Sequence, residues 1–402
     1  MKDVKIAFIG GGKNLDVKNF TTHIQKENKI SATVYFYDFD KTINKNETTY
    51  KTVKTIDNAL IDADFVIISL SETLEEMRPD ILTAEKYGIY QTAYDSVGPL
   101  GIMRTLRIVP KIKYIAEKIK ELCPNAWVIN CTNPLSVSVK TLYKAFPDIK
   151  AFGVSYEASK TRQLINSILG RNEKDWQDIK INVLGINNFT FLTQATCGGE
   201  SVLPKLKEFA KNNYDKGANR VRYDLFLLFG VLPATCDRKI VEFLPKNWYL
   251  KSPEQAKEWG LERDLENECE EIFEELVRQI EALSGLSDVV VNANMPNRGQ
   301  MEGMPLGAVV ETNVKFTKDS IKPMYAGGLS AVVQALVYKA YAEEELAFSA
   351  GFYGDYENAF KAIISDQLAN LDFKDARSLF NEMLENNKDK LPYYEDFIKS
   401  IK

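Results

Sequence analysis

The sequence is poor in the side chains that metal sites and disulfides need. Its 402 residues include a single histidine, His23, and only five cysteines. One histidine excludes His-rich zinc sites and relays that pass a proton between two histidines. The cysteines lack the paired spacing of zinc sites, and we expect them to be reduced thiols: Cys123, Cys131, Cys197, Cys236 and Cys269.

The sequence also lacks an excess of positive charge and long apolar runs. There are 51 Lys and Arg against 56 Asp and Glu, a formal net charge of -5, which gives a nucleic-acid backbone little to bind. No apolar run approaches the ~20 residues of a membrane helix. Residues 1–5 lead into a short apolar strand without the apolar core of a signal peptide. We therefore expect a cytoplasmic protein that binds neither nucleic acid nor membranes.

The apolar pattern predicts an α/β fold. Four buried-type strands, at residues 4–9, 32–37, 65–70 and 126–130, alternate with helical stretches such as 107–122, as in a parallel sheet covered on both faces. We expect a Rossmann-like, doubly wound domain over residues 1–152. A mixed α+β domain over 153–402 would follow without a linker, similar to the C-terminal arrangement of lactate and malate dehydrogenases. Its predicted strands lie at 180–196 and 287–295, between helical stretches at 203–230, 253–284 and 328–350.

A glycine turn after the first strand predicts a dinucleotide site. Gly10, Gly11 and Gly12 lie where the backbone would approach a pyrophosphate, although Leu15 replaces the third glycine of the usual fingerprint. A tight turn with only a structural role is the alternative. Asp38 ends the second strand, where its carboxylate would bind a ribose and repel a 2′-phosphate, which favours NAD over NADP. Further candidate cofactor contacts close the third and fourth strands: Ser69, Asn130 and Asn133.

The chemistry needs a proton carrier other than histidine. Dehydrogenases of the lactate and malate type use a histidine in the middle of the chain, and none exists here. Instead, a series of polar motifs resembles the NAD-dependent family 4 glycoside hydrolases, which include α-glucosidases, α-galactosidases, α-galacturonidases and 6-phospho-glycosidases. The motifs occur in register along the chain, at residues 6–12, 98–107, 130–134, 185–189, 294–299, 323–329 and 343–346.

The resemblance implies a redox-assisted elimination. In that family NAD⁺ oxidises the 3-hydroxyl of the sugar, a base removes the proton on C2, the C1 leaving group departs, water adds and the hydride returns. A divalent metal, usually Mn²⁺, polarises the C2 and C3 oxygens. A cysteine and a histidine hold it.

This sequence departs from the family at both metal ligands. Ser155 stands at the cysteine position and Asn188 at the histidine position, and both are neutral donors with less affinity for transition metals. The site would hold a metal weakly through oxygen, work without one, or have lost its activity. A plain hydrogen-bonded pair is the other interpretation of Ser155 and Asn188. Without a metal, polarisation could come from Asn188, Tyr156 or Lys239.

The resemblance also implies roles for residues outside the metal site. Asp224 matches the position of an aspartate base, Tyr223 is the alternative base, and Glu157 is a candidate acid. Arg238 could pair with a substrate carboxylate or phosphate, and Lys239 follows it in place of a histidine. Structural roles, such as helix capping for Asp224 and surface ion pairs for the arginines, are the alternatives. The predicted substrate contacts are Asn133, Tyr156, Asn187, Arg238 and Arg298.

These features predict a glycosidase that acts on an α-glycoside or uronide with bound NAD. Two alternatives stay open: an NAD-dependent dehydrogenase of a sugar or hydroxy acid, and a silent NAD-binding homologue. The resemblance also implies a homodimer or homotetramer.

Overall fold

The computed structural model describes residues 2–11, 16–27, 29–40, 49–93, 95–262 and 271–400. Its strands are β1 Lys2–Gly10, β2 Ile30–Tyr37, β3 Lys51–Thr52, β4 Phe65–Ser69, β5 Trp127–Asn130, β6 Lys150–Val154, β7 Lys180–Ile186, β8 Phe189–Cys197, β9 Glu200–Ser201, β10 Leu232–Pro233, β11 Val289–Pro296, β12 Val309–Thr317 and β13 Ser320–Pro323. Its helices are α1 Asp16–Glu27, α2 Ile56–Leu60, α3 Leu74–Lys86, α4 Gly98–Leu122, α5 Leu135–Ala145, α6 Glu157–Ile168, α7 Leu203–Asn213, α8 Arg220–Phe229, α9 Asp237–Ile240, α10 Lys246–Tyr249, α11 Pro253–Glu258, α12 Glu271–Leu283, α13 Ala331–Tyr353, α14 Tyr356–Ser365, α15 Phe373–Asn387 and α16 Tyr394–Ser400. Three 3-10 helices complete these elements: Glu173–Asp178, Val241–Phe243 and Lys388–Lys390.

The N-terminal half is the predicted parallel sheet. Its strands follow the order β3-β2-β1-β4-β5-β6, and all are parallel. Strand β4 is buried at every position, as expected for a strand covered on both faces. Gly10 pairs with Ser69, and Asn130 pairs with Ile68 and Gly153, so the carboxyl ends of β1, β4, β5 and β6 meet at one edge. That edge is where open α/β sheets bind ligands.

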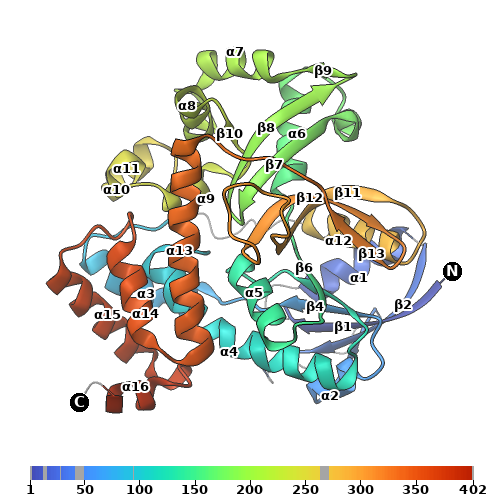
Figure 1. The fold of residues 1–402 in the computed structure, drawn as a ribbon, viewed down its shortest axis with the longest axis horizontal. Helices are drawn as coiled ribbons and strands as arrows, with labels where there is room; N and C mark the ends of the chain where they lie inside the picture. The colour runs from blue at the N-terminus through green and yellow to red at the C-terminus, as the bar shows by residue number, and fades with distance from the viewer. Residues whose placement is uncertain are drawn as a thin grey trace.

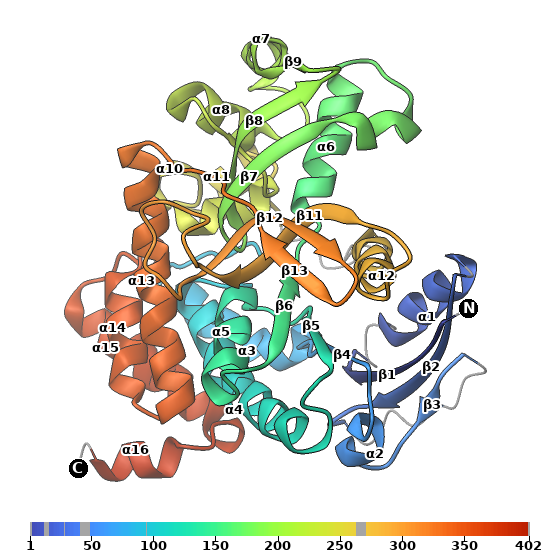
Figure 2. The ribbon, with the colours of Figure 1, turned by 45° about the vertical axis from the view of Figure 1, so that its right-hand side comes forward.

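Helices cover both faces of this sheet (Figures 1 and 2). Side chains of α1 and α12, such as Phe20 and Leu276, share one apolar cluster with β1 and β2. On the other face α2, α4 and α5 bury side chains such as Ile112 and Leu142. In the described ranges no helix is both long and apolar enough to cross a membrane.

The sheet continues beyond β6 into antiparallel strands. Strand β11 pairs with β6, with Asn294 opposite Gly153, and β12, β7, β8 and β10 follow in that order. The expected boundary at residues 152 and 153 therefore falls inside β6, and strand pairing crosses it. The segment at 180–196 is a hairpin, β7 and β8. The stretch at 203–230 forms two helices, since Gly217 and Asn219 adopt left-handed backbone conformations between α7 and α8.

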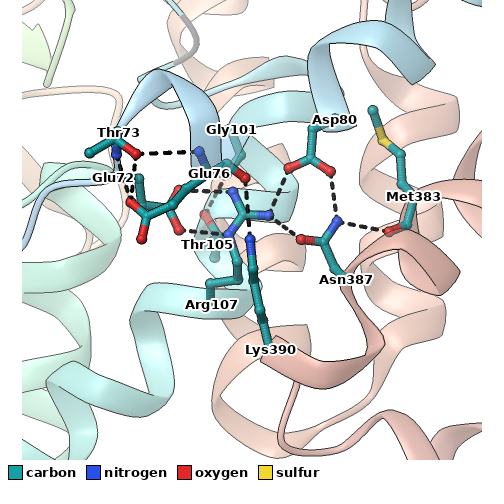
Figure 3. A network of polar contacts seen from close by, with 10 residues as sticks. All are labelled: Glu72, Thr73, Glu76, Asp80, Gly101, Thr105, Arg107, Met383, Asn387 and Lys390. Carbon is teal, nitrogen blue, oxygen red and sulfur yellow. Dashed lines mark hydrogen bonds and ion pairs between the residues drawn. The ribbon is translucent and has the colours of Figure 1, made fainter. Parts of the chain in front are cut away.

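A buried ionic network fixes α4, whose first turns lie beside the site described below. Arg107 of α4 donates to both oxygens of Glu72, at 2.6 and 2.8 Å, and to Asp80 of α3 at 2.7 Å (Figure 3). Asn387 of α15 accepts from Arg107 at 2.9 Å and donates to Asp80 at 2.6 Å. One guanidinium thus joins the consecutive helices α3 and α4 to α15, which lies far along the chain.

We predict that Arg107→Met lowers the free energy of unfolding by about 3–5 kcal/mol, because it leaves the buried carboxylates of Glu72 and Asp80 without their cation. Chemical denaturation measures the change. The control is Lys388→Ala, which removes an exposed, solvent-screened ion pair to Glu385 and should change the free energy of unfolding far less. Equal losses in the two variants would contradict the structural role of the network.

Candidate active site

The predicted glycine turn lies at the carboxyl edge of the parallel sheet. Gly10 and Gly11 both have positive φ, 83° and 80°, which side chains rarely adopt. A Cβ on Gly10 would lie 2.6 Å from the Ser69 carbonyl oxygen, so only glycine allows β1 and β4 to stay this close at their ends. Ser69 donates its hydroxyl to Asp16 of α1 at 2.7 Å. Gly12 lies outside the described residues.

The other predicted cofactor contacts lie along the same edge. Asp38 directly follows β2, and one of its oxygens accepts from the Asp40 backbone at 2.9 Å. Asn130 ends β5 and donates to the Thr132 carbonyl, while its own amide oxygen is buried without a hydrogen-bond partner in the described part of the chain. Asn133 is half-buried just before α5. Such an unpaired buried oxygen at the strand ends is suited to a ligand donor.

Close packing of α5 on β6 positions Ser155. A side chain at Gly153 would meet Leu135 and Val139 of α5 at 3.0 Å, so glycine permits this approach. Ser155 follows β6 and is 5% exposed, and its hydroxyl has no well-formed hydrogen bond among the residues described.

Behind Ser155 lies a buried acid, Glu311 of β12. It accepts weak hydrogen bonds from Asn292 at 3.4 Å and Asn294 at 3.3 Å. Complete burial raises the pKa of Glu311 to about 7, and the nearby charge of Glu157 adds to the rise. The approach of Ser155 and the two asparagines offsets part of this burial cost.

The turn between β7 and β8 carries the other former ligand position. Asn188 has a left-handed backbone, φ 63°, which asparagine tolerates better than most residues. Its side-chain amide donates to the hydroxyl of Ser96 at 3.2 Å. The neighbouring Asn187 donates its backbone N–H to Ser136 of α5, and its buried side-chain nitrogen lacks a partner within the described ranges.

A buried ammonium lies beside these residues, in a group that we call the Lys239 cluster: Asp95, Arg104, Tyr156, Glu157 and Lys239. The Lys239 ammonium is 3.2 Å from Asp95, 3.8 Å from Glu157 and 3.4 Å from the Tyr156 hydroxyl. Asp95 also pairs with Arg104 of α4 at 3.2 Å. Burial opposes the charged form, but Tyr156, Asp95 and Glu157 outweigh it and raise the pKa of Lys239 well above its usual value.

The two candidate bases on α8 have different surroundings. Asp224 is half-buried and accepts a hydrogen bond of 2.5 Å from the Tyr249 hydroxyl. Tyr223 is buried among apolar side chains and packs against Phe209, and burial raises its pKa. Asp237, just before Lys239, accepts from backbone N–H groups at the start of α8 and so joins α8 to α9.

The predicted arginines lie in separate places. Arg238 is half-buried on α9, next to Lys239 in sequence, and its carbonyl accepts from Thr92 at 2.5 Å. Arg298 is exposed beyond the end of β11. Because β11 runs antiparallel to β6, Arg298 lies past the amino end of β6, whereas Ser155 follows its carboxyl end. The structure therefore does not bring Arg298 to the Lys239 cluster.

The sequence analysis did not single out four residues that surround this site: Asp95, Ser96, Arg104 and Glu311. Glu311 had a local signal, since it is an acid that directly follows Val309 and Val310 within β12. Asp95 precedes the motif at 98–107 and Arg104 lies within it, but the contacts of Asp95 with Lys239 and of Ser96 with Asn188 depend on the fold.

We predict that Glu311 makes the protein less stable as pH rises. The unfolded carboxyl ionises near 4.5 and the folded one near 7, so the folded state holds its proton between these values. The stabilisation is complete below about pH 4.5 and is lost by pH 8, a loss of about 3 kcal/mol. Glu311→Gln should remove this part of the pH dependence in urea unfolding at several pH values. The exposed control Glu200→Gln should keep it, and an unchanged slope in Glu311→Gln would refute the assignment.

Comparisons with known proteins agree with this arrangement. Residues 5–171 match the model of the family 4 glycosyl hydrolases, and residues 183–369 match the model of the family 4 glycosyl hydrolase C-terminal domain. The chain is 41% identical to an alpha-galacturonidase of Thermoanaerobacterium saccharolyticum, over 96% of each protein.

Two crystal structures have the same fold. The lplD protein of Bacillus subtilis matches with a TM-score of 0.85 at 35% identity, over 96% of this chain and all of that one. A 6-phospho-alpha-glucosidase from gut microorganisms, in complex with NAD and Mn²⁺, matches with a TM-score of 0.82, over 97% of this chain and 99% of the other. Its identity is 18%, so that likeness concerns the fold alone. The two family models and the 41% identical relative show that this chain belongs to the family 4 glycoside hydrolases.

Proposed function

We propose that this glycosidase cleaves an α-galacturonide by NAD-dependent oxidation at C3, elimination across C1 and C2, addition of water and return of the hydride. One observation carries the proposal. The strand ends suited to a dinucleotide adjoin a buried group of charged side chains: Asn130 pairs with Gly153 of β6, and Ser155, Tyr156 and Glu157 follow that strand.

The residues at the sheet edge fit NAD. Gly10 and Gly11 offer a backbone surface that a Cβ would fill, and Asp38 would accept hydrogen bonds from a ribose. The unpaired oxygen of Asn130 lies at the same edge, and we assign Gly12, Ser69 and Asn133 to this site as further contacts. When bound, NAD supplies reversible removal of a hydride from C3 of the sugar.

A uronide substrate is supported by the relative named alpha-galacturonidase, 41% identical to this chain. A galacturonide carries a carboxylate, which Arg238 could bind through two parallel hydrogen bonds. Asn187 and Tyr156 are the proposed hydroxyl contacts. Arg298 would need a different conformation, or a second copy of the chain, to take part.

Two acids handle the protons in this proposal. Asp224 removes the proton from C2, and the electron pair of the C2–H bond forms the C1–C2 double bond as the C1–O bond breaks. Glu157, a carboxylate beside Lys239 in the free protein, takes up a proton before cleavage and gives it to the departing oxygen. Tyr223 is the weaker candidate base because burial raises its pKa. Water then adds to C1 while C2 regains a proton.

We also propose that the chain forms a homodimer or homotetramer. Large apolar side chains are exposed on α13 and on the loops beside it: Leu306, Met324, Tyr325, Val332 and Tyr338. Hydrogen bonds from Tyr325 to Glu302 and from Gln334 to Gly303 hold these loops against the start of α13. A second copy of the chain would cover this surface.

We predict a strong preference for NAD that depends on Asp38. Asp38→Ala should weaken NAD binding by about 10-fold, the effect of losing one hydrogen bond to a charged group. It should also reduce the difference between the affinities for NAD and NADP. Calorimetric titration with both cofactors measures this, with Asp57→Ala on α2 as a control. Equal affinities of the unmodified protein for NAD and NADP would refute the prediction.

The reaction itself is tested in D₂O with NAD and three substrates: an α-galacturonide, an α-galactoside and a 6-phospho-α-glucoside. We expect cleavage of the galacturonide, with deuterium at C2 of the product. Asp224→Asn should lower cleavage and exchange together by about 10²–10⁴-fold and leave NAD binding unchanged. Glu157→Gln should slow cleavage of poor leaving groups most.

Several outcomes would contradict this proposal. Cleavage without exchange at C2 would mean ordinary hydrolysis. Accumulation of NADH in step with consumed substrate would indicate a dehydrogenase. Exchange that survives in Asp224→Asn and disappears in Glu157→Gln would transfer the role of base to Glu157.

A further inference from the structure

The Lys239 cluster places a positive charge beside neighbours of positions 155 and 188, the two positions that the family resemblance assigns to metal ligands. Tyr156 and Glu157, which contact Lys239, directly follow Ser155. Asp95, which pairs with Lys239, directly precedes Ser96, and Ser96 accepts from Asn188. The ammonium therefore has one partner beside each former ligand position.

The donors at this site do not fit a divalent cation. Ser155 and Asn188 are neutral, and Asn188 directs its amide N–H toward Ser96. The carboxylates of Asp95 and Glu157 already face the cations of Arg104 and Lys239. In the described part of the chain no three His, Cys, Asp or Glu side chains are grouped as a metal site needs. A divalent ion here would meet an ammonium within the same cluster, and the two carboxylates of that cluster are already shared with cations.

Lys239 is nevertheless accessible to a small ligand. Its side chain is 17% exposed, and the buried Asn187 amide nitrogen nearby lacks a partner among the described residues. A substrate with several hydroxyl groups could satisfy this nitrogen. Two acids orient the ammonium, so its position is set before a substrate arrives.

We propose that the Lys239 ammonium replaces the divalent metal and stabilises the negative charge that develops on the sugar oxygen at C3 during elimination. The inference rests on the proposed function above. When the base takes the proton from C2, electron density moves toward the C3 ketone oxygen, and the ammonium pairs with that charge. Lys239 keeps its own protons throughout and is neither oxidised nor covalently changed. Lys239 carries its charge before the substrate binds, because Tyr156, Asp95 and Glu157 raise its pKa well above the usual value.

The first test measures Mn²⁺ binding to the protein loaded with NAD, by electron paramagnetic resonance and calorimetry. We expect no Mn²⁺ site with micromolar affinity. The triple change Lys239→Met, Ser155→Cys and Asn188→His should create one, because it removes the ammonium and supplies a thiolate and an imidazole. Micromolar Mn²⁺ binding by the unmodified protein would overturn the inference, whether or not any glycoside is cleaved.

The second test uses galacturonide cleavage and C2 exchange. Activity should survive a chelator, Lys239→Met should lower kcat by about 100-fold or more, and Lys239→Arg should restore part of it. NAD affinity and circular dichroism should stay unchanged in both variants. The matched control is Lys160→Met, since Lys160 also lies over the Tyr156 ring, at 4.6 Å, but outside the Lys239 cluster.

Complete loss of activity in a chelator with recovery on Mn²⁺ addition would overturn the inference, as would full activity in Lys239→Met. Failure of the proposed function has a different signature: the unmodified protein then shows neither galacturonide cleavage nor C2 exchange. Mn²⁺ binding still decides the inference in that case.

Discussion

The Asp95 carboxylate is the constraint on which the site depends. It holds Arg104 of α4 and Lys239 of α9 at 3.2 Å each, and it thereby joins the parallel half of the fold to the segment after β10. A buried cation without such a partner would lose its favourable hydration free energy and gain no interaction that offsets the loss. Since Arg107 fixes the same helix α4 against α3 and α15, the position of Asp95 follows from packing across the whole core. The contact with Asp95 in turn fixes the position of the Lys239 ammonium.

The parallel half of the fold could be predicted because its signals are local. The four strands predicted there each contain a short apolar run, and Gly10, Asp38 and Asn130 mark strand ends that a parallel sheet brings to one edge. The continuation through β11 and β12 could not be predicted in the same way. The pairing of Asn294 with Gly153 joins segments far apart in the chain, and no local pattern encodes it. The break before α8 had a local cause, Gly217 and Asn219, which the helical pattern concealed.

The same distinction applies to the site. Ser155, Tyr156 and Glu157 could be predicted together only from the family resemblance, which places them at one motif. The structure shows that they follow β6, a strand that the sequence patterns did not predict. The contact of Asn188 with Ser96 spans 92 positions and appears only in the folded chain. Arg298 shows the converse: its motif belongs to the family pattern, but the antiparallel register of β11 places it away from Ser155. Motifs identify candidate site residues, whereas strand register determines which of them lie close together in the fold.

The charges of the Lys239 cluster balance one another, and the neutral residues Ser155 and Asn188 fit this balance. Asp95 and Glu157 face Arg104 and Lys239, so the cluster is balanced without any ion. A thiolate at position 155 would add a negative charge next to Glu157 and Glu311, and only a further cation could compensate it. With serine in that place, Glu311 can stay protonated up to about pH 7 behind a neutral hydroxyl. Neutral Ser155 and Asn188 therefore suit a site whose positive charge is already supplied by Lys239. The neutral residues at the two positions that the family resemblance assigns to metal ligands, and the buried lysine beside them, form one electrostatic arrangement.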